Sequence, residues 1–223
     1  MTFPRVKLLA GAVGLVAWKT GVLPRLGLGV RGRVAANTML GVAAVAFARA
    51  RGYGWRELGL GPEDVSRGLR VGASAAFVTL TGYGLATAIP SLRTKLADVV
   101  AELELPEITE WALVHVPLGT VLAEELAFRS VLNAVAKRSL SPPVEILLQA
   151  VAFGMWHAFP EPDENTPTGG VVLATGLGGL LLTRLRNQSG SVVAPALLHL
   201  AVNSGGVLVG TAVKRVTTTS GSM

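Results

Sequence analysis

The chain has 223 residues, of which 50% are hydrophobic and 15% charged, and its mean hydropathy is +0.52. This composition predicts one membrane domain over residues 1–223, without a separate soluble domain. The sequence has no cysteine, which excludes disulfides and thiolate metal sites, and its net charge of +6 lies mainly in short loops between apolar runs, so no nucleic-acid partner is predicted.

Seven apolar runs are candidates for membrane spans, so the predicted fold is an all-α, multi-pass transmembrane helical bundle with about six to seven spans. Several runs are shorter than the roughly 20 residues that a bilayer requires, and such spans must thin the bilayer or recruit flanking residues. The runs cover residues 8–24, 34–50, 71–90, 111–132, 143–160, 169–184 and 191–212.

The first run, residues 8–24, has two interpretations. Arg5 and Lys7 precede its apolar core, as in a secretory signal peptide. The sequence Trp18-Lys19-Thr20 lacks the small residues of a cleavage site. An uncleaved first helix is therefore the favoured prediction, and its loss would leave six spans.

The segments between the runs predict short helices and an orientation. Residues 55–69 and 91–105 combine charges with apolar residues at helical spacing, which predicts short interfacial helices on the membrane or on the bundle. Lys and Arg are more frequent in the loops on the side of the N terminus than in the opposite loops. The positive-inside rule therefore predicts an integral multi-pass membrane protein with a cytoplasmic N terminus.

The fourth run contains two adjacent acids, in the sequence Glu124-Glu125-Leu-Ala-Phe-Arg129. Charge within hydrocarbon is costly, about 2.5–3.5 kcal/mol for Asp, Lys or Arg at a helix centre. On a helix Glu125 and Arg129 are four residues apart and can form an ion pair, whereas Glu124 is rotated by about 100° from Glu125. One acid can then be neutralised by Arg129 while the other faces elsewhere, and a carboxylate in an apolar pocket suits a general base. The alternative is a helix that ends at Glu124, with the charges at the membrane surface.

Two of the three histidines lie in the fifth and seventh runs. Phe153 and His157 are one helical turn apart, and so are His199 and Asn203. Each pair has a simpler explanation, an aromatic belt at the membrane surface for His157 and an interhelical hydrogen bond for His199. The patterns Glu-Glu-xxx-Arg, Phe-xxx-His and His-xxx-Asn nevertheless follow one another on three apolar helices, and together they predict a hydrolytic site within the membrane.

With these three motifs the chain resembles the CAAX protease and bacteriocin-processing family, also called the Abi or Rce1-like intramembrane proteases. The resemblance covers about residues 110–210, the expected catalytic core. It implies an endopeptidase that cuts a membrane-associated peptide or protein in the plasma membrane of a prokaryote. Ser130 departs from the family, which usually has glycine after the arginine. The sequence shows no pocket for a lipid tail, so specificity for prenylated proteins is not implied.

The resemblance also implies roles for the motif residues. Glu124 would be the general base that activates water, with help from His157. His199 and Asn203 would stabilise the oxyanion that forms at the scissile carbonyl. The supporting residues, by charge pairing and orientation, would be Glu125, Arg129 and Phe153.

No cofactor is predicted, but zinc is kept as an alternative. Two histidines and a carboxylate can bind Zn²⁺ with one open position, although the His-Glu-x-x-His motif is absent and asparagine is a poor ligand. Two other functions remain open, a non-catalytic immunity or scaffold protein of the same fold and a small ion-coupled transporter. The transporter hypothesis predicts inverted repeats, and the sequence shows none. The oligomeric state is not predicted.

Overall fold

A computed structural model describes residues 3–100, 104–158 and 168–220, and within these ranges all regular structure is helical. The predicted all-α fold is confirmed for this part of the chain. The helices are α1 (Phe3–Ala17), η1 (Trp18–Val22), α2 (Leu23–Arg25), α3 (Val30–Ala50), η2 (Pro62–Asp64), α4 (Val65–Thr87), α5 (Pro90–Asp98), α6 (Leu105–Glu110), η3 (Trp111–Leu122), η4 (Glu125–Leu132), α7 (Asn133–Lys137), α8 (Pro142–Trp156), α9 (Thr168–Ser189) and α10 (Val193–Ser220).

Within the described ranges, four helical stretches have the length and composition to cross a membrane. A fifth span results if Pro62–Ala86 and Pro90–Asp98, which are bent by 113° against each other, count as one broken span. The expected six to seven spans are therefore not confirmed. The four stretches are Arg5–Arg25, Pro106–Lys137, Thr168–Ser189 and Val193–Val216.

Two predicted spans, 34–50 and 143–160, are not among these candidates, for different reasons. The first belongs to α3, which is long enough but carries Arg31, Arg33 and Arg49. The second corresponds to α8, whose 15 residues rise only about 22 Å, less than the roughly 30 Å of a hydrocarbon core. The end of the run 143–160 lies outside the described residues.

Large apolar side chains cover the outer faces of the helices. Val13, Phe77, Leu85 and Leu173 are each between 65% and 71% exposed. Soluble monomers rarely expose apolar surface on this scale, whereas lipid-facing helices do so as a rule. The protein is an integral membrane protein, as its composition predicted.

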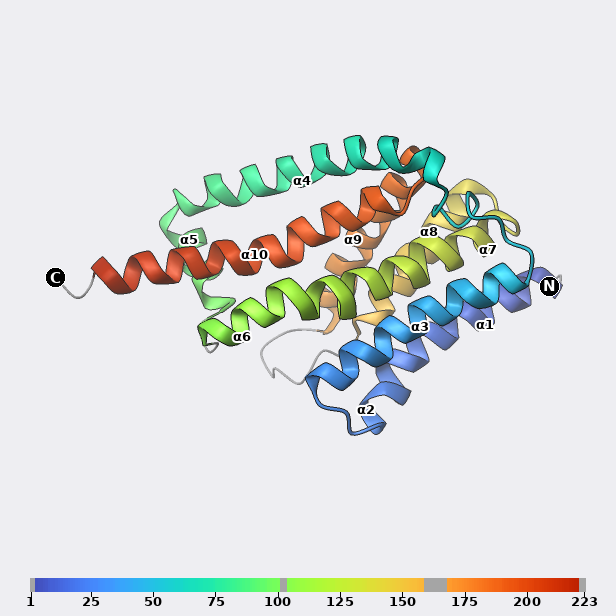
Figure 1. The fold of residues 1–223 in the computed structure, drawn as a ribbon, viewed down its shortest axis with the longest axis horizontal. Coiled ribbons are helices and arrows are strands. Elements are labelled where there is room, and N and C mark those ends of the chain that lie inside the picture. Colours follow the sequence, from blue (N-terminus) through green and yellow to red (C-terminus); the bar gives the residue numbers. More distant parts are fainter. Residues whose placement is uncertain (1–2, 101–103, 159–167, 221–223) are drawn as a thin grey trace.

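The long helical stretch from α6 to α7 runs through the middle of the bundle, beside α3 on one side and α10 on the other (Figure 1). Its segments η3 and η4 are π-helical, and η3 contains Pro117, which has no amide hydrogen to donate. π-Helical turns occur frequently at functional sites. The stretch continues past Glu124 to Lys137, so the alternative of a helix that ends at Glu124 is wrong.

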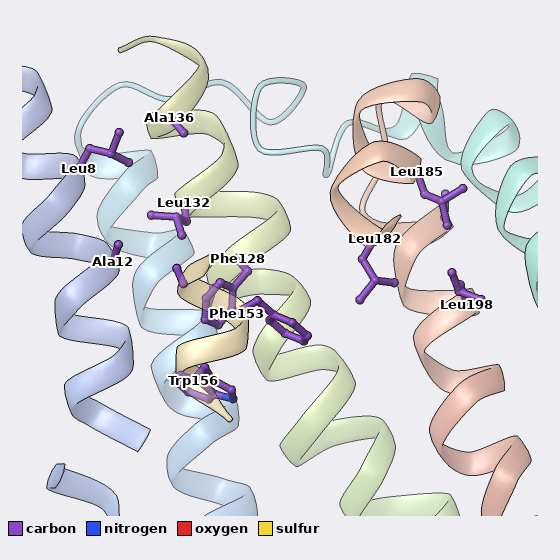
Figure 2. Packing of buried hydrophobic residues seen from close by; sticks show 13 residues of the cluster. Leu8, Ala12, Phe128, Leu132, Ala136, Phe153, Trp156, Leu182, Leu185 and Leu198 are labelled. Atoms are coloured by element: carbon purple, nitrogen blue, oxygen red, sulfur yellow. The ribbon is translucent and has the colours of Figure 1, made fainter. Parts of the chain in front are cut away.

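Aromatic rings join this stretch to α8 in the main core (Figure 2). The ring of Phe128 makes edge-to-face contacts with Phe153 and Trp156, with centroids 5.3 and 5.4 Å apart. Leu8 of α1 and Leu182 of α9 belong to the same cluster. The core thus fixes α8 against η4, although α8 is too short to span a bilayer.

The two predicted interfacial segments differ from each other. Residues 55–69 form a loop, η2 and the first turn of α4 rather than one helix, and Leu58 in the loop is fully buried. In the other segment α5 packs on α10, at the point where a Cβ on Gly210 would collide with the carbonyl oxygen of Leu96. The described part of 91–105 therefore lies on the bundle.

Candidate active site

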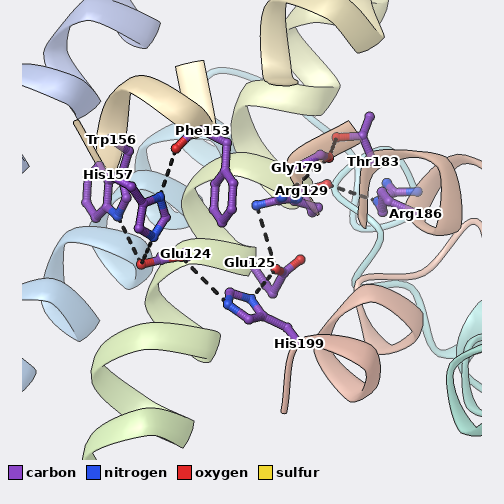
Figure 3. Close-up of polar contacts among 10 residues, drawn as sticks. All are labelled: Glu124, Glu125, Arg129, Phe153, Trp156, His157, Gly179, Thr183, Arg186 and His199. Carbon is purple, nitrogen blue, oxygen red and sulfur yellow. Dashed lines mark hydrogen bonds and ion pairs between the residues drawn. The ribbon is translucent and has the colours of Figure 1, made fainter. Parts of the chain in front are cut away.

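Glu124 and Glu125 lie where η3 passes into η4, and both side chains are buried, with 4% and 0% exposed. Because neighbouring helical positions face different directions, the two carboxylates meet different helices (Figure 3). Glu124 points toward the end of α8, and Glu125 points toward α10. The three motifs predicted from the sequence therefore meet at these two acids.

The end of α8 contributes two side chains to Glu124. Trp156 donates its indole N–H to Glu124 Oε1 at 2.9 Å. His157 follows the last residue of α8, and its Nε2 lies 3.9 Å from the same oxygen. His157 Nδ1 lies 2.9 Å from the carbonyl oxygen of Phe153, one turn earlier. That carbonyl can only accept, so Nδ1 carries the hydrogen in this contact.

His199 of α10 lies between the two carboxylates and is 7% exposed. Its Nδ1 is 2.9 Å from Glu125 Oε1, a hydrogen-bonding distance. Its Nε2 is 3.9 Å from Glu124 Oε2. One ring therefore spans both acids of the Glu-Glu motif.

Arg129 forms the predicted ion pair with Glu125, with Nη1 3.7 Å from Oε1, and both groups are almost completely buried. The guanidinium also stacks on the ring of Phe153, whose centroid lies 4.0 Å away. Phe153 in turn contacts the rings of His157 and His199, at centroid distances of 4.7 and 6.1 Å. Phe153 thus packs between the buried cation and both histidines.

Asn203 lies one turn beyond His199 on α10 and is half-buried. No hydrogen bond joins its side chain to another residue in the part of the chain that the structure describes. The geometry therefore brings together six of the seven predicted site residues. Asn203 shares the helix of His199 without contacting the carboxylates.

The centre of the site contains polar atoms with unused hydrogen-bonding capacity. Among the described residues, Glu124 Oε2, Glu125 Oε2 and two guanidinium nitrogens of Arg129 have no hydrogen-bond partner. More than about 90% of buried polar groups in proteins do have one. Four of the seven such atoms in the described residues lie at this site, and the other three lie outside it. The four atoms can bind a polar ligand, such as a water molecule or a peptide carbonyl.

A metal centre needs several ligand atoms that converge on one point. Within the described ranges, no group of three or more His, Asp or Glu side chains has a geometry that could hold a metal ion. Glu124, His157 and His199 have a suitable composition, and each histidine uses Nδ1 for a contact within the protein, which leaves Nε2 facing Glu124.

Two contacts of the site were not predicted. The indole of Trp156 was interpreted only as part of an aromatic belt, although its position beside His157 could have indicated it. Arg186 of α9 donates from Nε to the carbonyl oxygen of Arg129 at 3.0 Å and from Nη2 to the carbonyl oxygen of Glu57 at 2.8 Å. The sequence signal for Arg186 was the presence of an arginine on a largely apolar helix.

A family model matches the part of the chain that carries this site. Residues 106–205 match the family described as Type II CAAX prenyl endopeptidase Rce1-like, which confirms the resemblance. The match contains all seven predicted site residues. No curated protein and no solved structure matches the chain.

Proposed function

Because residues 106–205 belong to the Rce1-like CAAX endopeptidase family, we propose that this membrane protein hydrolyses a peptide bond of a membrane-associated protein or peptide, with Glu124 activating the water. One observation carries the proposal. The buried Glu124 carboxylate has His157 Nε2 at 3.9 Å from Oε1 and His199 Nε2 at 3.9 Å from Oε2. This distance is too long for a direct hydrogen bond, but one oxygen atom fits at about 2.8 Å from both groups.

The two histidines have different roles, because their Nδ1 atoms have different partners. His157 Nδ1 donates to the neutral carbonyl of Phe153. A neutral imidazole in this tautomer has an acceptor at Nε2. His157 can then accept a hydrogen from the nucleophilic water and orient its lone pair toward the substrate.

His199 Nδ1 faces the carboxylate of Glu125 instead. In the proposed mechanism both ring nitrogens of His199 carry hydrogen, so that Nδ1 donates to Glu125 and Nε2 is also a donor. A donor at Nε2 suits the oxyanion that forms as the scissile carbonyl becomes tetrahedral. Asn203, one turn further along α10, would add a second donor once substrate is bound.

The proposed reaction then has two steps. Water attacks the carbonyl carbon, its proton passes to Glu124, and the oxyanion accepts hydrogen bonds from His199 and Asn203. The intermediate collapses as the C–N bond breaks, and the protonated Glu124 gives its proton to the leaving amine. The products are a carboxylic acid and an amine, and Glu124 returns to its ionised form.

The test uses purified protein in lipid nanodiscs and a mixed set of membrane-anchored peptides, with products identified by mass spectrometry. Glu124→Gln keeps the shape of the side chain and removes the base, and should lower kcat by about 10²–10⁴-fold. The matched control is Glu110→Gln, on the same helical stretch but paired with Arg31 at the surface. This control should cleave like the wild type.

The other outcomes separate the alternatives. Cleavage that persists at the wild-type rate in Glu124→Gln would contradict the proposed base. Cleavage that EDTA abolishes and zinc restores would support the metal-dependent alternative. A folded wild type that cleaves none of the peptides would favour a scaffold, or a transporter if proton-coupled uptake into proteoliposomes is then measured.

A further inference from the structure

A second cavity lies on the other side of the central stretch from α10. It has a volume of about 670 Å³ and is bounded by α1, α3 and the stretch from η4 to the residue after α7. This volume lies within the range of about 300–1,000 Å³ that is usual for ligand sites. None of the glutamates or histidines of the candidate active site lines it. We call this cavity the α1–α3 groove.

The walls of the α1–α3 groove are apolar. Leu8 and Leu15 line it from α1, Ala44 and Phe47 from α3, and Val131 from η4. The side chain of Phe47 is 60% exposed. The groove is thus open toward the surroundings at Phe47, whereas Leu8 forms part of its buried wall.

Gly11 marks the open space within the groove. It lies on α1 between the two leucines, and a Cβ built on it would have no other heavy atom within 4 Å. A glycine at this position keeps the groove wide rather than allowing two helices to touch. Contacts between α1 and a neighbouring helix at Gly11 therefore do not explain the width of the groove.

One end of the groove is cationic. Lys7, Arg51 and Arg138 line it, and none of the described lining residues is an acid. Arg138 is already paired with Glu57 at 2.6 Å and lies over the ring of Tyr53. The guanidinium of Arg51 lies 4.8 Å from the ring centroid of Phe47, directly beside the apolar wall.

The order of charged and apolar residues along the groove matches the order of head group and acyl chain in a phospholipid. From Lys7 to Leu15 the helix α1 rises by about 12 Å, at 1.5 Å per residue. A cationic end followed by an apolar channel of this length matches a phosphate head group with the upper part of an acyl chain. Basic pockets between membrane helices bind anionic head groups in this way.

We propose that the α1–α3 groove is a binding site for an anionic phospholipid of the leaflet on the N-terminal side. Arg51 and Lys7 bind the phosphate, while an acyl chain lies along Leu8, Gly11 and Leu15. The site is independent of the chemistry at Glu124. It would stabilise the attachment of α1 to α3 and to η4, the segment that carries Glu125.

The test measures binding of phosphatidylglycerol and phosphatidylcholine to delipidated protein in detergent by native mass spectrometry. The wild type should bind phosphatidylglycerol more tightly. Gly11→Leu should remove most of this binding, because Gly11 lines the groove and a Cβ there meets no heavy atom within 4 Å, which leaves the longer side chain room to fill the groove. The matched control is Gly14→Leu, one turn away, where a Cβ also meets nothing within 4 Å but the residue does not line the groove.

Charge variants test the head group. R51Q and K7Q should each weaken phosphatidylglycerol binding about fivefold, the effect of about 1 kcal/mol per basic residue near a membrane surface. They should weaken phosphatidylcholine binding less, because the choline cation balances the charge of its phosphate. Arg25→Gln, a cation at the opposite end of the first span, should have no effect. Glycerol 3-phosphate, which has a head group without a tail, should not compete at equal concentration.

Three results would overturn the proposal. Gly11→Leu that binds phosphatidylglycerol like the wild type would show that lipid binds elsewhere. Equal affinity for the two lipids in the wild type and in R51Q would show that the cations do not recognise a head group. Competition by farnesol as strong as that by phosphatidylglycerol would assign the groove to an uncharged isoprenoid tail.

Discussion

His199 Nδ1 and Glu125 Oε1 lie 2.9 Å apart, although the two residues are separated by 74 positions in the chain. The same carboxylate is 3.7 Å from Arg129, so Glu125 is shared between a histidine and a buried guanidinium. Glu125 therefore couples the orientation of His199 to the charge balance of the core. Its loss should affect stability and catalysis separately.

Glu125→Gln should destabilise the protein by about 3–5 kcal/mol, because it leaves the buried Arg129 without a counter-charge. It should also lower kcat, since an amide replaces the carboxylate that holds His199 Nδ1 at 2.9 Å. The double variant E125Q/R129M should recover most of the stability and none of the activity. Denaturant unfolding in detergent and cleavage of a membrane-anchored peptide measure the two effects. Full recovery of cleavage in the double variant would assign Glu125 to charge balance alone.

Trp156→Phe should lower kcat roughly tenfold, since a hydrogen bond to a charged group contributes about 1.5–3 kcal/mol and Trp156 holds Glu124 Oε1 at 2.9 Å. The matched control is Trp18→Phe. Trp18 also donates its indole N–H, to Asn37 Oδ1 at 3.0 Å. This bond does not involve Glu124, whose indole donor is Trp156. Equal losses of kcat in the two variants, after both are shown to be folded, would mean that Trp156 acts only through packing.

Gly179→Ala should reduce both stability and activity. A Cβ at this position would lie 2.9 Å from Cβ of Phe153, the ring that separates Arg129 from His157. Overpacking of this kind costs typically about 1–3 kcal/mol. The neighbouring Gly178→Ala has no atom within 4 Å of its new Cβ, and should be neutral or stabilising by up to about 1 kcal/mol through helix propensity. Unfolding midpoints and cleavage rates of the two variants provide the comparison.

Glu57→Gln should change the pH dependence of stability. The backbone amide of Gly54, and next the guanidinium of Arg138, lower the pKa of Glu57 below its ordinary value of 4.5. A lowered pKa contributes stability above the unfolded-state value and loses it as pH falls through the folded-state value. The side chain is exposed, so the contribution is at most about 1 kcal/mol.

The wild type should therefore exceed Glu57→Gln slightly in thermal stability at pH 7, and the difference should shrink as the pH falls below 4.5 and through the folded-state pKa. Melting curves of both proteins in the same detergent, measured across this range, provide the check. A difference that grows as the solution becomes more acidic would contradict the sign of the effect.

Patterns of residues close together in the sequence predicted several contacts of the candidate site. The spacing of Glu125 and Arg129 predicted their ion pair, and the spacing of Phe153 and His157 predicted a shared turn; both follow from helical periodicity, which depends only on near neighbours. The three motifs also lie within residues 106–205, the part of the chain that matches the Rce1-like family. The number of spans did not follow from hydropathy, because α8 ends at Trp156 and is held by packing rather than by lipid.

By itself, the sequence determined the all-helical membrane fold and the residue types of the candidate site, since apolar composition and helical spacing are properties of continuous segments. Only the tertiary structure decided which acid meets which histidine, that Trp156 donates to Glu124, and that α1 and α3 enclose a groove with a cationic end. These relationships depend on the offsets and rotations of packed helices. Those are set by contacts such as Phe128 against Phe153, between residues far apart in the chain.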